Sequence, residues 1–178
     1  MAFFTELETE ARARGLDFLV IGGLAVNFYG YSRDTADLDL LIQKDDRTAW
    51  LELFITLKYA VEHDAGPFVQ LTPPQSGAWP VDLMLVAEPT FKPMLTECKE
   101  VDMYGARMRI PNLLHLLALK LHALKHTRAH RFLKDFQDVE GLVRINKLDL
   151  RAKNVRELFL KYGNLDLYEK IRRAYTAD

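Results

Sequence analysis

Two aspartates separated by a single leucine are the residues of this 178-residue chain best suited to chemistry. Asp37 and Asp39 lie within residues 36–43, whose apolar pattern predicts a β-strand. Side chains alternate along a strand, so both carboxylates should share one face, spaced about 6.6–6.8 Å along the chain. Carboxylate oxygens are the ligands that Mg²⁺ prefers, and two of them on one face suit a pair of Mg²⁺ ions.

A third carboxylate, Asp82, lies in the apolar run of residues 81–86, which predicts a further strand. A lone carboxylate among apolar neighbours is costly unless a cation compensates it. We therefore predict Asp82 as the third metal ligand and as the base that activates an acceptor hydroxyl.

A pair of glycines precedes the aspartates and suits a phosphate site. Gly22 and Gly23 lack a Cβ atom, so a polyphosphate can approach their backbone closely. The N–H groups that open the short helix predicted over residues 24–29 favour an anion. A nucleoside triphosphate is thus expected between this turn and the metals, with Arg33 and Thr35 donating to phosphate or sugar.

Each of these features alone also has an ordinary structural interpretation. An Asp-x-Asp pair is often the solvated face of an edge strand, and a Gly-Gly pair is often a tight turn. Their order in this chain favours a metal-dependent site, because strand, Gly-Gly, short helix, Asp-x-Asp and a later Asp-bearing strand follow one another.

The remaining patterns predict an α/β region followed by a helical region. Strands are expected over residues 17–21, 36–43, 68–71 and 81–86. Helices are expected over residues 3–14, 24–29, 45–58, 113–124, 129–145, 151–162 and 165–175. The predicted fold is α/β, with helices packed on a mixed sheet over residues 1–106 and a helical bundle over residues 107–178.

Taken together, the motifs resemble the signature of the DNA polymerase β-like nucleotidyltransferase superfamily. That signature is an apolar residue, Gly and Gly/Ser, roughly a dozen residues, Asp-x-Asp/Glu, and an acid on a later strand. The positions that fit it are Ile21, Gly22, Gly23, Asp37, Asp39 and Asp82. The longer string, with Ala25, Gly30, Arg33 and Thr35, resembles the small bacterial abortive-infection and toxin-type nucleotidyltransferases.

That bacterial group continues with Lys-Leu-x-Ala and then Lys-Asp-x-x-Asp-Leu. The corresponding stretches are residues 120–123 and 134–139. The resemblance implies that Lys120 meets the nucleotide phosphates and that Asp135 serves the site, with Asp138 as a second candidate. Relatives often carry an Arg two residues before the Lys-Asp pair, whereas Arg131 lies three residues before Lys134, which leaves its role open.

Without the resemblance, these residues have simpler interpretations. Lys120 can be a snorkelling residue on an amphipathic helix. A cluster of ion pairs on a helix surface can also include Lys134, Asp135 and Asp138. Asp138 follows Lys134 by four residues and Asp135 by three, so the three side chains share one face of a helix.

The resemblance implies transfer of a nucleoside monophosphate from an NTP to an acceptor hydroxyl, with Mg²⁺ or Mn²⁺ bound and pyrophosphate released. Residues 1–106 would be the catalytic core. The acceptor would be tRNA or a protein, in a toxin–antitoxin or phage-defence setting with a cognate toxin or antitoxin partner. Two alternatives stay open: a catalytically silent, antitoxin-like binding partner, and a nucleotidyltransferase that modifies a small molecule such as an antibiotic.

Composition and charge fit this interpretation. The chain is 49% hydrophobic and 28% charged, which is typical of globular proteins. Residues 1–106 hold 8 basic and 17 acidic side chains, whereas residues 107–178 hold 16 and 8. The basic half suggests a nucleic-acid backbone as partner; alternatively, the two halves simply attract each other.

Cysteine content and hydropathy bear on the compartment. Cys98 is the single cysteine, so no internal disulfide can form. The acidic start does not resemble a signal peptide, and no apolar run approaches the ~20 residues that span a membrane. We expect a cytoplasmic protein with no membrane partner.

Three histidines form the remaining motif. His122, His126 and His130 recur every four residues, and on one continuous helix they would form a stripe able to bind Zn²⁺. No metalloprotease glutamate accompanies them, and the helix is expected to break near Thr127, so a solvated or RNA-facing stripe is favoured. The sequence contains neither a P-loop nor a Gly-x-Ser-x-Gly motif.

Overall fold

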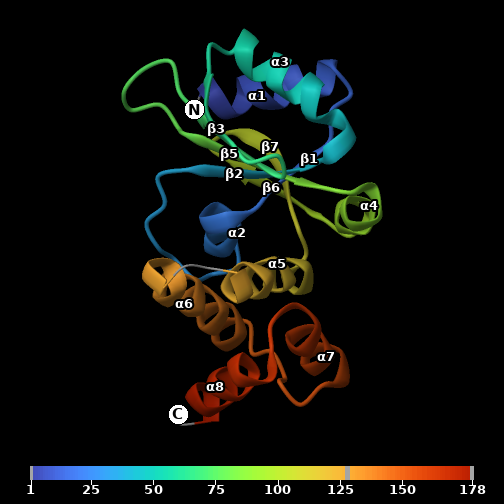
Figure 1. Cartoon of the computed structure of the whole chain (residues 1–178), viewed down its shortest axis with the longest axis vertical. Coiled ribbons are helices and arrows are strands. Elements are labelled where there is room, and N and C mark those ends of the chain that lie inside the picture. The colour runs from blue at the N-terminus through green and yellow to red at the C-terminus, as the bar shows by residue number, and fades with distance from the viewer. Residues whose placement is uncertain (1, 127–128, 177–178) are drawn as a thin grey trace. The chain divides into compact units, whose positions relative to one another are not determined.

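A computed structural model describes residues 2–126 and 129–176 of the chain. Its contacts divide the chain into two compact units. The sheet unit comprises the residues up to Ala25 together with Asp34–Asn112, and the helical unit comprises Val26–Arg33 together with the residues from Leu113 onward (Figure 1). The predicted α/β fold class, a mixed sheet with flanking helices and then a helical region, is confirmed.

The sheet unit is built on a five-stranded mixed sheet with the order β1-β2-β5-β4-β3. These strands are β1 (Phe18–Val20), β2 (Leu38–Gln43), β3 (Ala60–Asp64), β4 (Phe68–Thr72) and β5 (Val81–Val86). The central pair β2–β5 is parallel and the other neighbouring pairs are antiparallel. A separate hairpin is formed by β6 (Lys99–Met103) and β7 (Ala106–Ile110).

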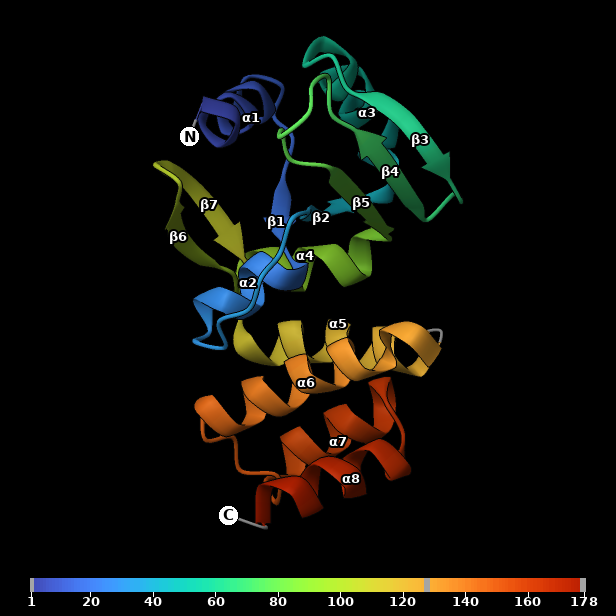
Figure 2. The same cartoon turned by 90° about the vertical axis from the view of Figure 1, so that its left-hand side faces the viewer.

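Helices cover both faces of this sheet. α1 (Ala2–Ala13) and α3 (Arg47–Thr56) lie on one face, and α4 (Glu88–Thr96) lies on the other (Figures 1 and 2). Trp50 of α3 packs edge-on against Phe18 of β1, and both side chains are buried. Because β2 is covered on both faces, its sequence is an almost continuous apolar run, interrupted by Asp39.

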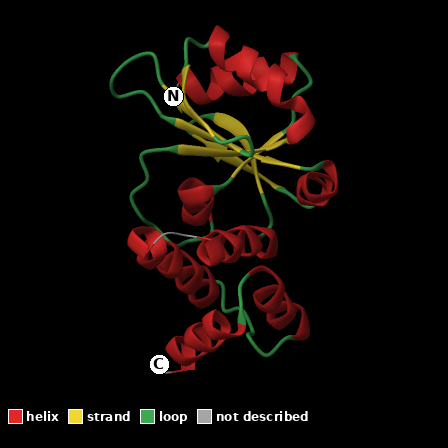
Figure 3. Cartoon of the chain, in the orientation of Figure 1, coloured by secondary structure: helices red, strands yellow, loops and turns green. Residues whose placement is uncertain are grey.

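Besides a short segment before β2, the helical unit contains four helices within the described residues, and the described strands all belong to the sheet unit (Figure 3). They are α5 (Leu113–His126), α6 (Ala129–Ile145), α7 (Lys153–Tyr162) and α8 (Leu165–Thr176). Leu117, Leu121, Val143 and Phe159 are fully buried in their shared core. These positions follow the helical spacing of the leucine-rich sequence, which is why the helices were predictable.

A short segment before β2 belongs to the helical unit. α2 (Gly22–Phe28) begins in the sheet unit and ends in the helical unit. The residues after it are held by the end of α6 and the residue that follows it, since Asn146 Nδ2 donates to the Tyr29 carbonyl at 3.1 Å. Tyr31 packs on Gly141, where a Cβ atom would lie 2.4 Å from the ring.

Predicted and observed elements agree best where the apolar pattern was strongest. The predictions for residues 81–86 and 129–145 are confirmed at both ends by β5 and α6. The Gly-Gly pair opens α2 and does not form a separate turn, and Lys44–Asp46 is a 3-10 turn ahead of α3. β3, α4 and the β6–β7 hairpin were not predicted; every residue of β3 is exposed, so it carries no buried pattern.

Within residues 2–126 and 129–176, none of the helices has the length and apolar character needed to cross a membrane.

The contact between Gly141 and Tyr31 gives a first test. We expect Gly141→Ala to destabilise the protein, because overpacking costs about 1–3 kcal/mol and exceeds the ~1 kcal/mol that alanine otherwise contributes inside a helix. Urea unfolding of the parent, Gly141→Ala, Tyr31→Ala and the double variant measures this. In the Tyr31→Ala background, Gly141→Ala should be neutral or stabilising. Equal destabilisation in both backgrounds would contradict the contact.

Candidate functional site

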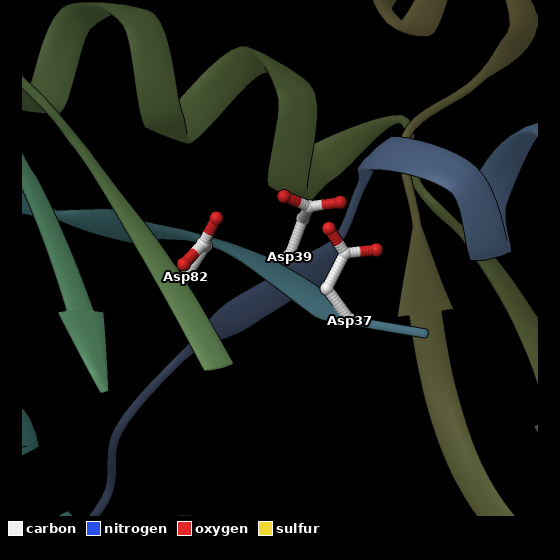
Figure 4. Close-up of side chains that lie close together, drawn as sticks. All are labelled: Asp37, Asp39 and Asp82. Atoms are coloured by element: carbon white, nitrogen blue, oxygen red, sulfur yellow. The ribbon is translucent and has the colours of Figure 1, made fainter. Parts of the chain in front are cut away.

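Three carboxylates converge in the sheet unit. Asp39 lies in β2 and Asp82 in β5, and the two are direct partners in the parallel ladder. Asp37 lies one residue before β2. One carboxylate oxygen from each aspartate can be chosen so that all three lie within 4.8 Å of one another (Figure 4). The structure thus brings together the three aspartates that the sequence singled out.

Two neutral side chains orient this acidic triad. Thr35 Oγ1 donates to Asp37 Oδ1 at 2.7 Å, and Gln70 Nε2 on β4 donates to Asp82 Oδ1 at 3.3 Å. Gln70 is the cross-strand partner of Asp82. Neither donor carries charge, so the repulsion among the three carboxylates is not offset by them. No pattern in the sequence pointed to Gln70, because its role depends on strand pairing.

The donor set fits a hard divalent cation. Oxygen ligands around Mg²⁺ lie ~2.0–2.1 Å from the ion, which places them roughly 3–4 Å from each other. The triad oxygens are within 4.8 Å, so a small inward shift of half-buried side chains brings them to that spacing. A bound Mg²⁺ would also relieve the mutual repulsion of the carboxylates.

Gly22 has a second structural role, which the sequence did not reveal. Its φ is +61°, and a Cβ atom built there would lie 1.7 Å from Asp39 Oδ2. The neighbouring Ile21 N–H donates to the Asp39 carbonyl at 2.9 Å, which holds the start of α2 against β2. A side chain at Gly22 would therefore displace the Asp39 carboxylate, so the glycine is required by the acidic triad itself.

A second charged cluster lies in the helical unit. The Asp138 carboxylate is completely buried and accepts two bonds from Arg33, from Nε at 2.7 Å and from Nη2 at 3.1 Å. Lys120 Nζ lies 2.6 Å from Asp138 Oδ2 and 3.9 Å from Asp135 Oδ1. Asn27 fixes the Arg33 backbone, donating to its carbonyl and accepting from its N–H, each at 3.0 Å.

This buried cluster corrects the simpler interpretations. Asp135 and Asp138 are buried, so they do not form a surface ion-pair cluster with the exposed Lys134. Lys120 is also buried and paired, so it is not a snorkelling residue. The Arg33 guanidinium binds Asp138 within its own unit, and its contact with phosphate or sugar stays a prediction.

The helix break expected near Thr127 falls outside the described residues; the structure describes α5 up to His126 and α6 from Ala129. The side chains of His130 and Arg131, and with them the predictions made for these residues, lie outside the described part of the structure.

Comparisons with known proteins support the fold. No protein-family model matches the chain, and no curated protein matches it in sequence. A crystal structure of ANT(2'')-Ia with adenylyl-2''-tobramycin is similar at a TM-score of 0.61 and 14% identity, over 96% of this chain and 95% of that one. An antigenic nucleotidyltransferase-like protein from Paracoccidioides brasiliensis is similar at 0.58 and 14%, over 96% and 91%.

A third solved structure agrees with these two. The lincomycin-bound lincosamide antibiotic adenylyltransferase LnuA is similar at a TM-score of 0.53 and 14% identity, over 76% of this chain and 90% of that one. At such identities the likeness concerns the fold, and the chain has the fold of nucleotidyltransferases.

The electrostatics of the acidic triad lead to a second prediction. In EDTA, Asp39→Asn should leave the melting temperature unchanged or raise it, because it removes one of three like charges that repel one another at short range. In excess Mg²⁺, the melting temperature of the parent should rise by more than that of Asp39→Asn. Thermal unfolding with and without Mg²⁺ measures both, with Asp45→Asn, an exposed carboxylate of the same unit, as control. An equal Mg²⁺ response in parent and Asp39→Asn would argue against metal binding here.

The buried cluster gives a third prediction. Asp138→Asn should lower the free energy of unfolding by about 3–5 kcal/mol, because Arg33 and Lys120 lose their shared buried partner. Asp166→Asn is the matched control: Asp166 pairs with Lys170 at 2.9 Å on the exposed surface, where such a pair contributes less than ~1 kcal/mol. Chemical denaturation of both variants tests the contrast, and similar losses would refute it.

Proposed function

We propose that this protein is a metal-dependent nucleotidyltransferase that moves a nucleoside monophosphate from an NTP to an acceptor hydroxyl. The observation that carries the proposal is the in-register pairing of Asp39 with Asp82, with Asp37 completing a group of oxygens within 4.8 Å. The nucleotidyltransferase fold supports it.

The reaction requires a base and a way to neutralise phosphate charge. The acceptor oxygen attacks the α-phosphorus, the bond from that phosphorus to the bridging oxygen breaks, and pyrophosphate leaves with the electron pair. Asp82 would take the hydroxyl proton, and the hydrogen bond from Gln70 would keep its carboxylate oriented. Bound divalent ions would polarise the attacking oxygen and offset the charge of the triphosphate. Asp37, Asp39 and Asp82 would hold them.

The glycines and the helical unit complete the proposal. Gly22 and Gly23 would leave the backbone at the start of α2 open to the triphosphate, and Thr35 would orient Asp37. Two proposed roles rest on the resemblance in sequence motifs: Lys120 as a phosphate contact and Asp135 as an acid of the site. Asp138 is assigned a positioning role, because its carboxylate is fully buried against Lys120 and Arg33.

The acceptor is proposed to be tRNA or a protein, in a toxin–antitoxin or phage-defence setting. The excess of basic over acidic residues after residue 106 supports a nucleic-acid acceptor. A small-molecule acceptor is the second candidate. It is favoured by the likeness to ANT(2'')-Ia and LnuA, which extends over at least 90% of each of those chains.

The proposal is tested by nucleotide transfer. The purified protein is incubated with each α-labelled NTP, Mg²⁺ or Mn²⁺, and in turn tRNA, a protein extract, or a panel of aminoglycosides and lincosamides. We expect label on one acceptor class, released pyrophosphate, and no transfer with EDTA. Asp82→Asn should lower the rate at least 10²-fold, as expected for loss of a general base, whereas Asp45→Asn should match the parent.

Two outcomes would overturn this assignment. If Asp82→Asn transferred nucleotide at the parent rate, Asp82 would not be the general base. No NTP binding by calorimetry, with or without Mg²⁺, would instead favour the catalytically silent binding partner.

A further inference from the structure

Two exposed histidines occupy one face at the end of α5. His122 and His126 are one helical turn apart, and their ring centroids are 4.6 Å from each other. We propose that this pair is a binding site for a divalent transition metal ion with affinity for imidazole nitrogen, such as Cu²⁺, Ni²⁺ or Zn²⁺. The site would be independent of the acidic triad and of nucleotide transfer.

The ring separation fits coordination of one ion. A metal–nitrogen bond of ~2.0–2.1 Å, extended by ~1.1 Å to the ring centre, places each centroid about 3.2 Å from the ion. Two imidazoles at ligand angles between 90° and 109° then have centroids about 4.5–5.2 Å apart. The observed 4.6 Å lies inside this range. The helix holds the pair in place, because residues four apart share one face.

Metal binding at this pair needs the neutral form of each imidazole. A neutral imidazole has a lone pair to give to a metal ion. His126 is also the last residue of α5, where the negative end of the helix dipole favours a cation. Lys125 acts in the opposite direction, because its positive charge repels the ion.

The chemistry of the ligands separates this site from the acidic triad. Imidazole selects the later first-row ions, with affinity rising from Ni²⁺ to Cu²⁺ and lower for Zn²⁺, whereas carboxylates suit Mg²⁺. Water would complete the coordination of an ion held by two protein ligands. Such an ion would cross-link the last turn of the helix that also carries Lys120, and so stabilise it.

Titration of tag-free protein with Cu²⁺, Ni²⁺ and Zn²⁺, followed by calorimetry and by thermal unfolding, tests the proposal. We expect a site, separate from any binding at the acidic triad, that binds in the order Cu²⁺, Ni²⁺, Zn²⁺ and raises the melting temperature. His126→Ala should weaken Ni²⁺ binding at least tenfold. His63→Ala, which removes an exposed histidine of β3, is the matched control and should leave the affinity for Ni²⁺ unchanged.

Two further variants identify the site. Lys125→Gln should tighten Ni²⁺ binding several-fold by removing the opposing charge, and Asp39→Asn should leave it unchanged. The proposal is overturned if His126→Ala binds Ni²⁺ as tightly as the parent, or if Asp39→Asn abolishes binding. All substituted side chains are exposed or half-buried, and circular dichroism verifies that each variant is folded.

Discussion

The parallel pairing of β2 with β5 is the constraint on which the candidate site depends. Asp39 alternates with Leu38 and Leu40, which are fully buried, and Asp82 alternates in the same way with Val81 and Leu83. A slip of one residue would turn either carboxylate into the core and the apolar side chains out of it. The packing of the core therefore fixes two like charges side by side, and in the proposed function a bound cation would offset their repulsion.

The backbone at the start of α2 is adapted to the same arrangement. Gly22 approaches the Asp39 carboxylate so closely that no side chain fits between them. The glycine thus leaves room for the carboxylate, and in the proposed function it would also keep the backbone accessible to a substrate phosphate. This explains physically why a glycine and an Asp-x-Asp strand belong to one site although they are far apart in sequence.

In the helical unit, a fully buried carboxylate has the corresponding organising role. Asp138 binds Arg33 and Lys120, and Asp135 lies near the same lysine, so the four charges balance. Because Arg33 belongs to the segment before β2, this cluster joins that segment to α5 and α6 within the unit. Removal of one member would leave buried charge without compensation, which is far more costly than breaking a surface pair.

The sequence by itself determined the three aspartates, the glycines before them, and the helices of the C-terminal region, because these follow from local spacing and apolar period. It did not predict β3, whose side chains are all exposed, or the hairpin from Lys99–Met103 to Ala106–Ile110. Only the tertiary structure decided that Gln70 orients Asp82 and that Arg33 binds Asp138, 105 positions later in the chain. Strand register and burial create these contacts between distant residues, and no local pattern encodes them.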